Sequence, residues 1–361
     1  MEDIRSWLAL TLVPGVPTST QRKLIGAFGS AEAIAAAHET SVASLLDEAE
    51  AQALAAGPDP SLVDRALRWL EGPDCRLLTL NSPAYPRALL NIHDAPVTLY
   101  ARGRIELLNS RLFAIVGSRN ASKTGIADAQ AMARALSDAG LTIVSGLALG
   151  IDAAAHRGGL AGASSSVAVM GTGADIAYPH GNRELFSQLA AEGCILSEFP
   201  LGTPPGRWTF PQRNRLISGL SHGVLVVEAA LGSGSLITAK CAVEQNRDVF
   251  AIPGSIHSTL SKGCHWLIKE GAKLVENAQD VLVELGLAEA KPPAAAPEEP
   301  RETDPVLEAL GYAPMSIDEF VMHTGLSAAT LAARLTRLEL EGHVEALAGG
   351  RFRRAGCRKI E

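Results

Sequence analysis

Short apolar segments alternate with helical patterns between residues 112 and 285, and this alternation constrains the fold more than any other feature. Each segment is β-branched and apolar on both faces, as expected for strands of a parallel sheet that helices cover on both sides. The pattern predicts an α/β fold built on a doubly wound sheet, whose sites lie at the carboxyl ends of the strands. The predicted strands are residues 113–116, 141–144, 166–170, 194–197, 223–227, 248–252 and 272–275, and the predicted helices are 126–139, 152–161, 183–191 and 235–246.

Residues 1–72 are alanine-rich and helical in pattern, and we expect a small domain there, ahead of a main domain at residues 73–287. A Pro-Gly-Val turn at residues 14–16 lies between two short helical patterns. The turn resembles that of a helix-hairpin-helix or SAM-like module, in which backbone amides can contact a phosphate backbone. A plain helical turn accounts for the same residues equally well.

The composition of residues 288–304, rich in proline, alanine and charge, predicts a solvated linker. Beyond it, residues 305–361 contain three helical patterns, at 305–310, 316–321 and 328–341, followed by a hairpin pattern at 342–354. Three helices followed by a small hairpin predict a winged helix.

The net charge of −7 predicts that any nucleic-acid site is a confined basic patch, because binding needs a local track of cations and not a basic total. No apolar run approaches the roughly 18 residues that cross a bilayer, and the first residues do not resemble a signal peptide. The five cysteines are scattered without a CxxC pair, which argues against structural zinc or a disulfide framework. We therefore expect a cytoplasmic protein with no membrane contact, metal or cofactor.

Glycine-rich turns follow several predicted strands, and cationic side chains accompany them. We interpret residues 117–119 and 210–215 as segments that present N–H groups and guanidinium forks to phosphate oxygens, with Phe210 stacked on an unpaired base. This combination favours a single-stranded nucleic acid over a small metabolite. The candidate contacts are Gly117, Ser118, Arg119, Lys123, Arg207, Phe210, Arg213 and Lys240, whereas Asn214 and Arg215 are better explained as clamps that hold the loop.

A nucleotide-binding P-loop is a competing interpretation of the first turn. Gly117, Lys123 and Thr124 have the spacing of that motif, but Ser122 stands where its second glycine is required. The apolar strand that ends at Glu228 could supply the acid that holds magnesium. An NTPase therefore stays open as an alternative.

The pair Asp152 and His156 has the spacing of neighbours on one helix face. The pair invites a catalytic interpretation, but no nucleophile lies at a recognisable offset from it. A helix N-cap at Asp152 and a structural hydrogen bond at His156 are the favoured explanation.

Eight short strings occur in a characteristic order along the predicted sheet domain. They are IVGSR at 115–119, VSGLA at 144–148, GID at 150–152 with His156, Tyr178-Pro179, Ser197-Glu198, FPQRNRLI at 210–217, SGSLITA at 233–239 and VFAIPG at 249–254. In this order they resemble the DNA-processing protein A family (DprA, also called Smf) from about residue 85 to residue 271. The resemblance implies an extended Rossmann-like fold that binds single-stranded DNA as a homodimer, without established catalysis. It also implies a protein that protects incoming DNA during natural transformation, helps displace single-strand-binding protein and loads the recombinase RecA.

The resemblance assigns roles to particular residues. Gly117, Ser118 and Arg119 match the phosphate-binding turn of the family, and Phe210 matches its base-contacting aromatic. Arg207 replaces a lysine of some members and keeps the charge, while Lys240 corresponds less closely to another basic contact.

Two other functions remain possible from the residues alone. A nucleotide hydrolase or phosphoribohydrolase would use Glu228 or the Asp152 and His156 pair. A lysine-decarboxylase-like enzyme needs a catalytic glutamate after the comparable turn. In this chain the turn at 233–238 is followed by Ala239 and Lys240 and not by an acid, which argues against such an enzyme.

A further interpretation makes the winged helix a module for duplex DNA or a protein partner. The cations of its tail are Arg351, Arg353, Arg354, Arg358 and Lys359.

Overall fold

The computed structural model describes residues 4–288, 305–310 and 314–355. The chain divides into two compact units, residues 1–288 and 289–361, and each is considered by itself. The predicted linker at 288–304 falls outside the described residues except for residue 288, as do Arg358 and Lys359.

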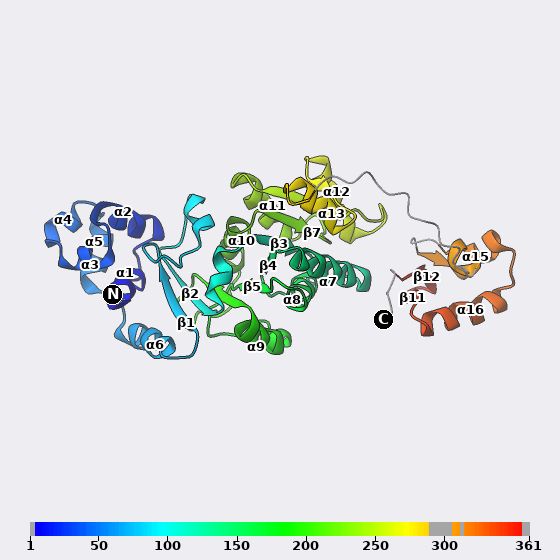
Figure 1. The fold of residues 1–361 in the computed structure, drawn as a ribbon, viewed down its shortest axis with the longest axis horizontal. Helices are drawn as coiled ribbons and strands as arrows, with labels where there is room; N and C mark the ends of the chain where they lie inside the picture. Colours follow the sequence, from blue (N-terminus) through cyan, green and yellow to red (C-terminus); the bar gives the residue numbers. More distant parts are fainter. Residues whose placement is uncertain (1–3, 289–304, 311–313, 356–361) are drawn as a thin grey trace. The chain divides into compact units, whose positions relative to one another are not determined.

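A mostly parallel sheet forms the centre of the first unit (Figure 1). Within residues 4–288 it contains nine strands in the order β1-β2-β6-β5-β4-β3-β7-β8-β9. Strands β1 and β2 pair antiparallel, as do β2 and β6, and all other neighbours pair parallel. The strands are β1 (Cys75–Thr79), β2 (Thr98–Gly103), β3 (Leu112–Val116), β4 (Thr142–Ser145), β5 (Ser166–Val169), β6 (Cys194–Ser197), β7 (Gly223–Val226), β8 (Asp248–Ala251) and β9 (Lys273–Leu274).

The strand order reverses at β3, which lies between β4 and β7. From β3 the chain builds outward through β4, β5 and β6 on one side, and then returns to begin the other side with β7. In open α/β sheets, the loops that leave two such neighbouring strands diverge and open a crevice at their carboxyl ends. The topology therefore places a crevice above β3 and β7.

Helices cover both faces of the sheet, and alternate strand residues divide between two cores. Phe113 and Ile115 pack with α7, α8 and α13, whereas Ala114 and Val116 pack on the opposite face with α10, α11 and α12. Apolar side chains dominate both cores, so β3 has no polar face. The helices are α7 (Lys123–Asp138), α8 (Ile151–Ala161), α9 (Arg183–Glu192), α10 (Thr209–Leu220), α11 (Ser235–Glu244), α12 (Lys262–Lys269) and α13 (Ala278–Glu284), with 3₁₀ turns at Arg87–Asn91, Ile105–Asn109, His180–Asn182 and Thr259–Ser261.

The structure corrects two local predictions. Residues 210–215 form the first half of helix α10 and not a turn. Pro211 lies in the first helical turn, where its missing N–H removes no intrahelical hydrogen bond. The N-cap of α8 is Gly150 and not Asp152, because the backbone at Gly150 has φ of 76° and a Cβ there would lie 2.3 Å from the Ser118 carbonyl oxygen.

The N-terminal helices belong to the same unit as the sheet. Trp7, Leu8 and Leu24 share one core with Tyr100 of β2 and Ile195 of β6. The helix-hairpin-helix likeness of this part stays a prediction. Its helices are α1 (Ile4–Thr11), α2 (Thr18–Phe28), α3 (Ala31–Ala36), α4 (Glu39–Ala43), α5 (Glu48–Ala56) and α6 (Pro60–Leu70).

The second unit has the predicted winged-helix order. A capping box between Ser316 and Glu319 begins α15, and Gly325 ends it in the left-handed conformation. Phe320 and Leu335 are fully buried in the small core. The elements are α14 (Pro305–Ala309), β10 (Met315–Ser316), α15 (Ile317–Thr324), α16 (Ala328–Leu340), β11 (Val344–Leu347) and β12 (Arg351–Arg354), with the strands in the order β10-β12-β11.

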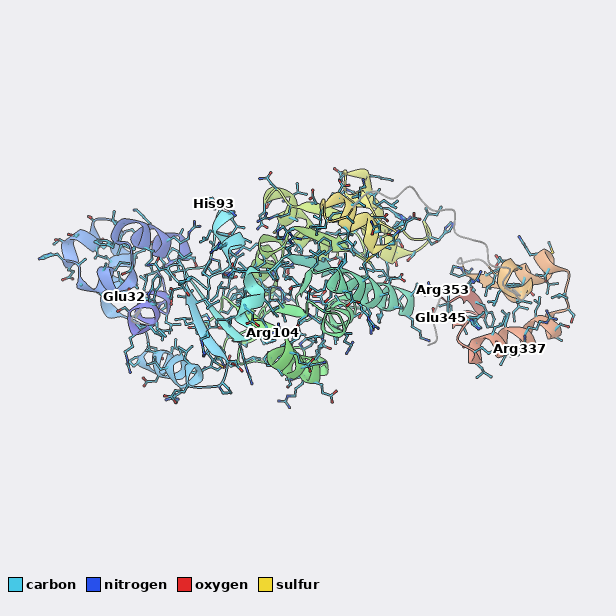
Figure 2. All side chains as sticks on the ribbon, viewed as in Figure 1. Glu32, His93, Arg104, Arg337, Glu345 and Arg353 are labelled. Atoms are coloured by element: carbon cyan, nitrogen blue, oxygen red, sulfur yellow. The ribbon has the colours of Figure 1, made fainter. Side chains whose placement is uncertain are left out.

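One of the arginines listed for the tail of the winged helix forms an ion pair within the domain. Arg353 on β12 donates to the Glu345 carboxylate on β11 at 2.8 and 3.0 Å, and Figure 2 labels both side chains. Arg351 on the same strand is exposed. Among the residues that the structure describes, no helix has the length and apolar character needed to cross a membrane.

Candidate nucleic-acid interface

A cavity of about 780 Å³ occupies the crevice above β3 and β7. The turn after β3, the turn before α11 and the first part of α10 supply its walls. Six of the eight predicted contacts line it, and Lys123 and Lys240 do not. The six are Gly117, Ser118, Arg119, Arg207, Phe210 and Arg213.

The turn after β3 is fixed by close packing. A Cβ at Gly117 would lie 2.7 Å from the Ile151 side chain and 2.9 Å from the Glu228 carbonyl oxygen, so only glycine fits. The Ser118 hydroxyl accepts from the Asn120 N–H at 3.1 Å, and its carbonyl accepts from the Ile151 N–H at 3.1 Å. The start of α8 thus holds the turn and leaves Arg119 exposed beyond it.

Arg119 and two aromatic rings form a stack at the cavity edge. The guanidinium carbon of Arg119 lies 5.3 Å from the centroid of the Phe210 ring, which is cation–π distance. The Tyr178 ring stacks against the same ring at a tilt, with centroids 5.9 Å apart and an interplanar angle of 30°. Tyr178 was not predicted as a member of the site, although the Tyr178-Pro179 dipeptide belongs to the strings that resemble the family.

The remaining cations differ in position. Arg207 is exposed and lines the cavity just before α10 begins. Lys123 is the first residue of α7 and exposed. Lys240 is exposed on α11, 3.8 Å from Glu244 in an i,i+4 pair, which is a weak interaction at such a surface.

Arg213 is buried beneath the cavity, with 4% of its surface exposed. Its guanidinium donates to the carbonyl oxygens of Gly146, at 2.7 Å, and Val169. Burial lowers the pKa of Arg213 to about 10, and the nearby Asp152 carboxylate acts against that shift. Contrary to the expectation of a DNA contact, this geometry makes Arg213 a clamp that ties α10 to the ends of β4 and β5.

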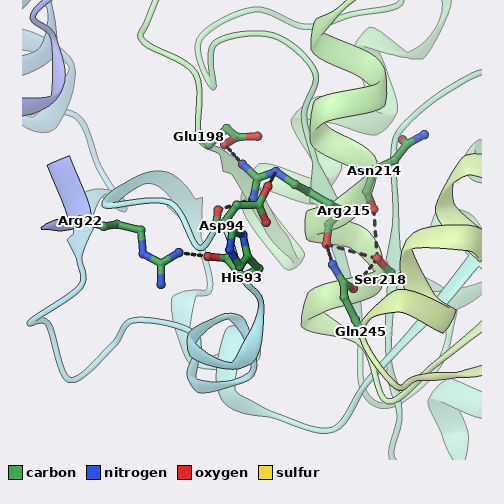
Figure 3. A network of polar contacts seen from close by, with 8 residues as sticks. All are labelled: Arg22, His93, Asp94, Glu198, Asn214, Arg215, Ser218 and Gln245. Atoms are coloured by element: carbon green, nitrogen blue, oxygen red, sulfur yellow. Dashed lines mark hydrogen bonds and ion pairs between the residues drawn. The ribbon is translucent and has the colours of Figure 1, made fainter. Parts of the chain in front are cut away.

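Arg215 and Asn214 also tie α10 to its surroundings. Arg215 contacts the carboxylates of Glu198 and of Asp94, the latter at 2.9 Å, as Figure 3 shows. Gln245, which directly follows α11, donates to the Arg215 carbonyl at 3.0 Å, and Asn214 donates to the Gly234 carbonyl at 3.3 Å. Both residues are held by protein groups, which agrees with their interpretation as clamps.

The anion position of a P-loop is filled by the protein itself. Ser122 donates to the Glu228 carboxylate from its backbone N–H, at 2.9 Å, and from its hydroxyl, at 2.7 Å. The same hydroxyl caps α7 by accepting from the Gly125 N–H at 3.0 Å. A carboxylate at this helix N-terminus takes the place that a nucleotide phosphate would need. The geometry therefore argues against the NTPase interpretation.

Asp152 and His156 also form hydrogen bonds with other groups of the protein. Asp152 accepts from the N–H groups of Gly146 and Ala148 at 3.1 and 3.4 Å. His156 accepts from the Leu147 N–H at 3.2 Å through Nε2, and its Nδ1 lies 2.8 Å from the Ser166 hydroxyl. Burial raises the pKa of Asp152 and lowers that of His156 to about 3. The pair fixes the loop after β4, and the structural interpretation fits it.

The described residues contain no cluster of three or more His, Cys, Asp or Glu side chains placed to hold a metal ion. The groups that the site does present are guanidinium groups, backbone turns and stacked rings. They lie in the crevice where the strand order reverses. These are the components of a site for a polyanion with flat bases.

Comparisons with known proteins agree with this class of site. The model of the family described as DNA recombination-mediator protein A matches residues 76–286, and a DprA winged-helix model matches residues 290–350. The chain belongs to the DNA recombination-mediator protein A family, whose members are also named DprA or Smf.

Individual relatives cover most of the chain. Protein Smf of Escherichia coli is 41% identical over 81% of this chain and 82% of its own length. The DNA processing protein DprA of Streptococcus pneumoniae is 50% identical over 55% of this chain and 71% of its own length.

Two solved structures share the fold. The crystal structure of DprA from S. pneumoniae aligns with a TM-score of 0.70 and 36% identity, covering 79% of this chain and 99% of that one. DprA from Helicobacter pylori, solved to study how it binds single-stranded DNA, aligns with a TM-score of 0.54 and 31% identity over 58% of this chain and 95% of that one. The extended Rossmann-like fold and the winged helix predicted from sequence are thereby confirmed.

Proposed function

We propose that this chain binds single-stranded DNA in the cavity above β3 and β7. Arg119 and Arg207 would hold phosphates, and Phe210, with Tyr178 behind it, would stack on a base. The observation that carries the proposal is that Arg119, Arg207 and Phe210 all line one cavity. Within the described part of the chain, neither arginine lies within ion-pair distance of a carboxylate, so both are available to phosphate oxygens.

The proposed binding is nearly independent of base sequence. Guanidinium groups and backbone amides recognise the phosphate backbone, which is the same for every sequence. An aromatic ring stacks on the face of any base. A duplex hides those faces, so the stack favours single strands.

In the cell we propose a cytoplasmic recombination mediator without catalysis of its own. It would act as a homodimer, protect single-stranded DNA taken up in natural transformation, help displace single-strand-binding protein and help load RecA. Membership of the family supports this role. Glu228, Asp152 and His156 are engaged in hydrogen bonds within the protein. Their engagement supports a DNA-binding protein over the nucleotide-processing alternatives.

A binding experiment with matched variants tests the proposal. Single-stranded and duplex oligonucleotides of the same length are titrated against the wild type, Arg119→Ala and Arg111→Ala. Arg111 is exposed just before β3, at the opposite end of the strand from Arg119, and serves as the control. We expect the wild type and Arg111→Ala to prefer the single strand and Arg119→Ala to bind it much more weakly. Undiminished binding by folded Arg119→Ala would reject this site.

A further inference from the structure

One wall of the cavity above β3 and β7 is not used by the proposed function. Residues 232–235 form this wall as the turn that leads into α11, together with Thr238 of the helix itself. Arg119, Arg207 and Phe210 come from other segments, the turn after β3 and the chain around the start of α10. At about 780 Å³ the cavity is in the size range of sites that bury a drug-sized ligand, so a bound strand can reach this wall as well.

The turn before α11 has backbone N–H groups that are free to donate. In the described part of the chain, the N–H groups of Gly232 and Gly234 form no hydrogen bond. Both glycines are exposed, and a Cβ at either would meet nothing within 4 Å, so nothing blocks the approach of a ligand. The N-terminus of α11 adds the positive partial charge of a helix start. Turns of this kind bind phosphate and other anions.

Thr238, one turn into α11, is a buried residue whose hydroxyl has no protein partner. It is 1% exposed, and among the described residues no hydrogen bond reaches its side chain. A helical threonine commonly donates to the carbonyl four residues before it. Here that carbonyl belongs to Gly234, and it already accepts from the Asn214 side chain at 3.3 Å and from the Ile237 N–H at 3.1 Å. The hydroxyl is therefore left for another acceptor.

The Thr238 hydroxyl is accessible from the cavity. In the described residues, the side-chain atoms that are both unpartnered and sealed from solvent belong to Trp7, Tyr100, Glu198 and Arg247. Thr238 is not one of them, and it lines the cavity, so the surface that its hydroxyl keeps faces that cavity. Buried polar groups in proteins are nearly always hydrogen-bonded. A ligand that brings an acceptor into the cavity supplies the partner that this group lacks.

The charges around the cavity favour an anion. Arg119, Arg207 and Arg213 all line it, whereas Asp152 is the one acidic residue among the described residues of the lining. The Asp152 carboxylate lies near the Arg213 guanidinium, which offsets its charge. An anion at the turn before α11 is therefore placed in a cavity of net positive charge.

We propose that the turn before α11 holds a phosphate of the bound strand, in addition to those held by Arg119 and Arg207. The free N–H groups of Gly232 and Gly234 and the Thr238 hydroxyl would all donate to its oxygens. A phosphodiester has acceptor oxygens and no donor, so it matches a set of groups that are free to donate. This inference rests on the proposed function, because the strand must occupy the cavity.

The test replaces Thr238 with valine, which keeps the shape of the side chain and removes only the unpartnered hydroxyl, so the variant should fold. Its affinity for oligo-dT is compared with that for an abasic strand of the same length, which has the sugar-phosphate backbone without bases. We expect Thr238→Val to raise the Kd about ten-fold for both strands at low salt, the effect of a lost hydrogen bond to a charged group. Phe210→Ala should weaken the binding of oligo-dT and leave that of the abasic strand nearly unchanged.

Thr40→Val is the matched control. It makes the same substitution at an exposed position of α4, outside the cavity lining, and should bind both strands like the wild type. Wild-type affinity of Thr238→Val for both strands, or a loss confined to oligo-dT, would overturn this inference, as would an abasic strand that the wild type does not bind at all. Failure of the folded wild type to bind oligo-dT would instead overturn the proposed function.

Discussion

The guanidinium carbon of Arg119 lies 5.3 Å from the ring centroid of Phe210, although one residue follows β3 and the other lies in the first turn of α10. The reversal of strand order at β3 brings these segments together. A group suited to phosphate and a ring suited to a base thus become neighbours, as a site for a single strand requires.

Removal of the Phe210 ring should weaken binding without unfolding the protein. A base stacked on an aromatic side chain contributes about 1–3 kcal/mol. We therefore expect Phe210→Ala to raise the Kd for oligo-dT by about 5- to 150-fold in a fluorescence anisotropy titration. Phe210→Tyr, which keeps the ring, is the matched control and should stay within about two-fold of the wild type. Equal affinity of the alanine and tyrosine variants would argue against stacking.

Arg213→Met should act on stability. The substitution leaves the buried Asp152 carboxylate without its cation and the Gly146 and Val169 carbonyls without their donor. Loss of one partner from a buried ionic network costs about 3–5 kcal/mol. We expect that loss in the free energy of unfolding, measured with urea.

Arg134→Met provides the comparison for Arg213→Met. Arg134 is 67% exposed and pairs with Asp138 at 3.8 Å, so its loss should change the unfolding free energy by less than about 1 kcal/mol. If Arg213→Met were as stable as Arg134→Met but no longer bound DNA, Arg213 would be a direct contact and not a clamp.

His156 should make the fold sensitive to acid. Its pKa is about 3 in the folded protein, because burial and the nearby Arg213 and Arg157 disfavour the imidazolium, against an ordinary value of 6.5. The stability that depends on neutral His156 is fully present above pH 6.5 and is lost progressively as the pH falls towards 3. Between pH 6.5 and 5 the loss amounts to about 2 kcal/mol.

A His156→Gln variant isolates that contribution. Urea unfolding of both proteins at pH 7.5 and pH 5 gives the stability gap between them at each pH. The variant should be less stable at pH 7.5, and the gap should narrow at pH 5 because only the wild type binds a proton at residue 156 on unfolding. A gap that does not change with pH would mean that His156 titrates normally in the fold.

Glu228→Gln tests whether the chain uses nucleotides. The carboxylate accepts two hydrogen bonds from Ser122 at the N-terminus of α7, so its neutralisation should destabilise the fold by about 1–2 kcal/mol. Neither the wild type nor the variant should hydrolyse ATP. Turnover by the wild type that disappears in the variant would restore the enzyme interpretation.

The main strands were predictable from sequence because each is apolar on both faces, which few other structures require. The start of helix α10 was not predictable from sequence. Proline is typical of turns as well as of the first turn of a helix, and the sequence alone does not show which of the two Pro211 occupies. The arginines show a second limit. Arg119 and Arg213 both stand in glycine- or proline-marked segments, and only the tertiary structure separates the exposed residue from the buried one.

Other parts of the site depend on contacts between distant segments. Ser122 was recognised as a departure from the P-loop, but its partner Glu228 becomes evident only when β3 and β7 are paired. Tyr178 lies in a turn after β5 that has no cation of its own, and its position against Phe210 follows from the packing of α10. Local patterns carry no information about such pairs.

The most direct test of the account is the salt dependence of single-strand binding. Each phosphate contact to a single strand contributes about −0.7 to the slope of log Kobs against log salt concentration. Arg119→Ala and Arg207→Ala should each make the measured slope for oligo-dT shallower by roughly 0.7 relative to the wild type, with Arg111→Ala unchanged. Slopes for both folded variants that equal the wild-type slope would contradict the claim that these two arginines hold the DNA backbone.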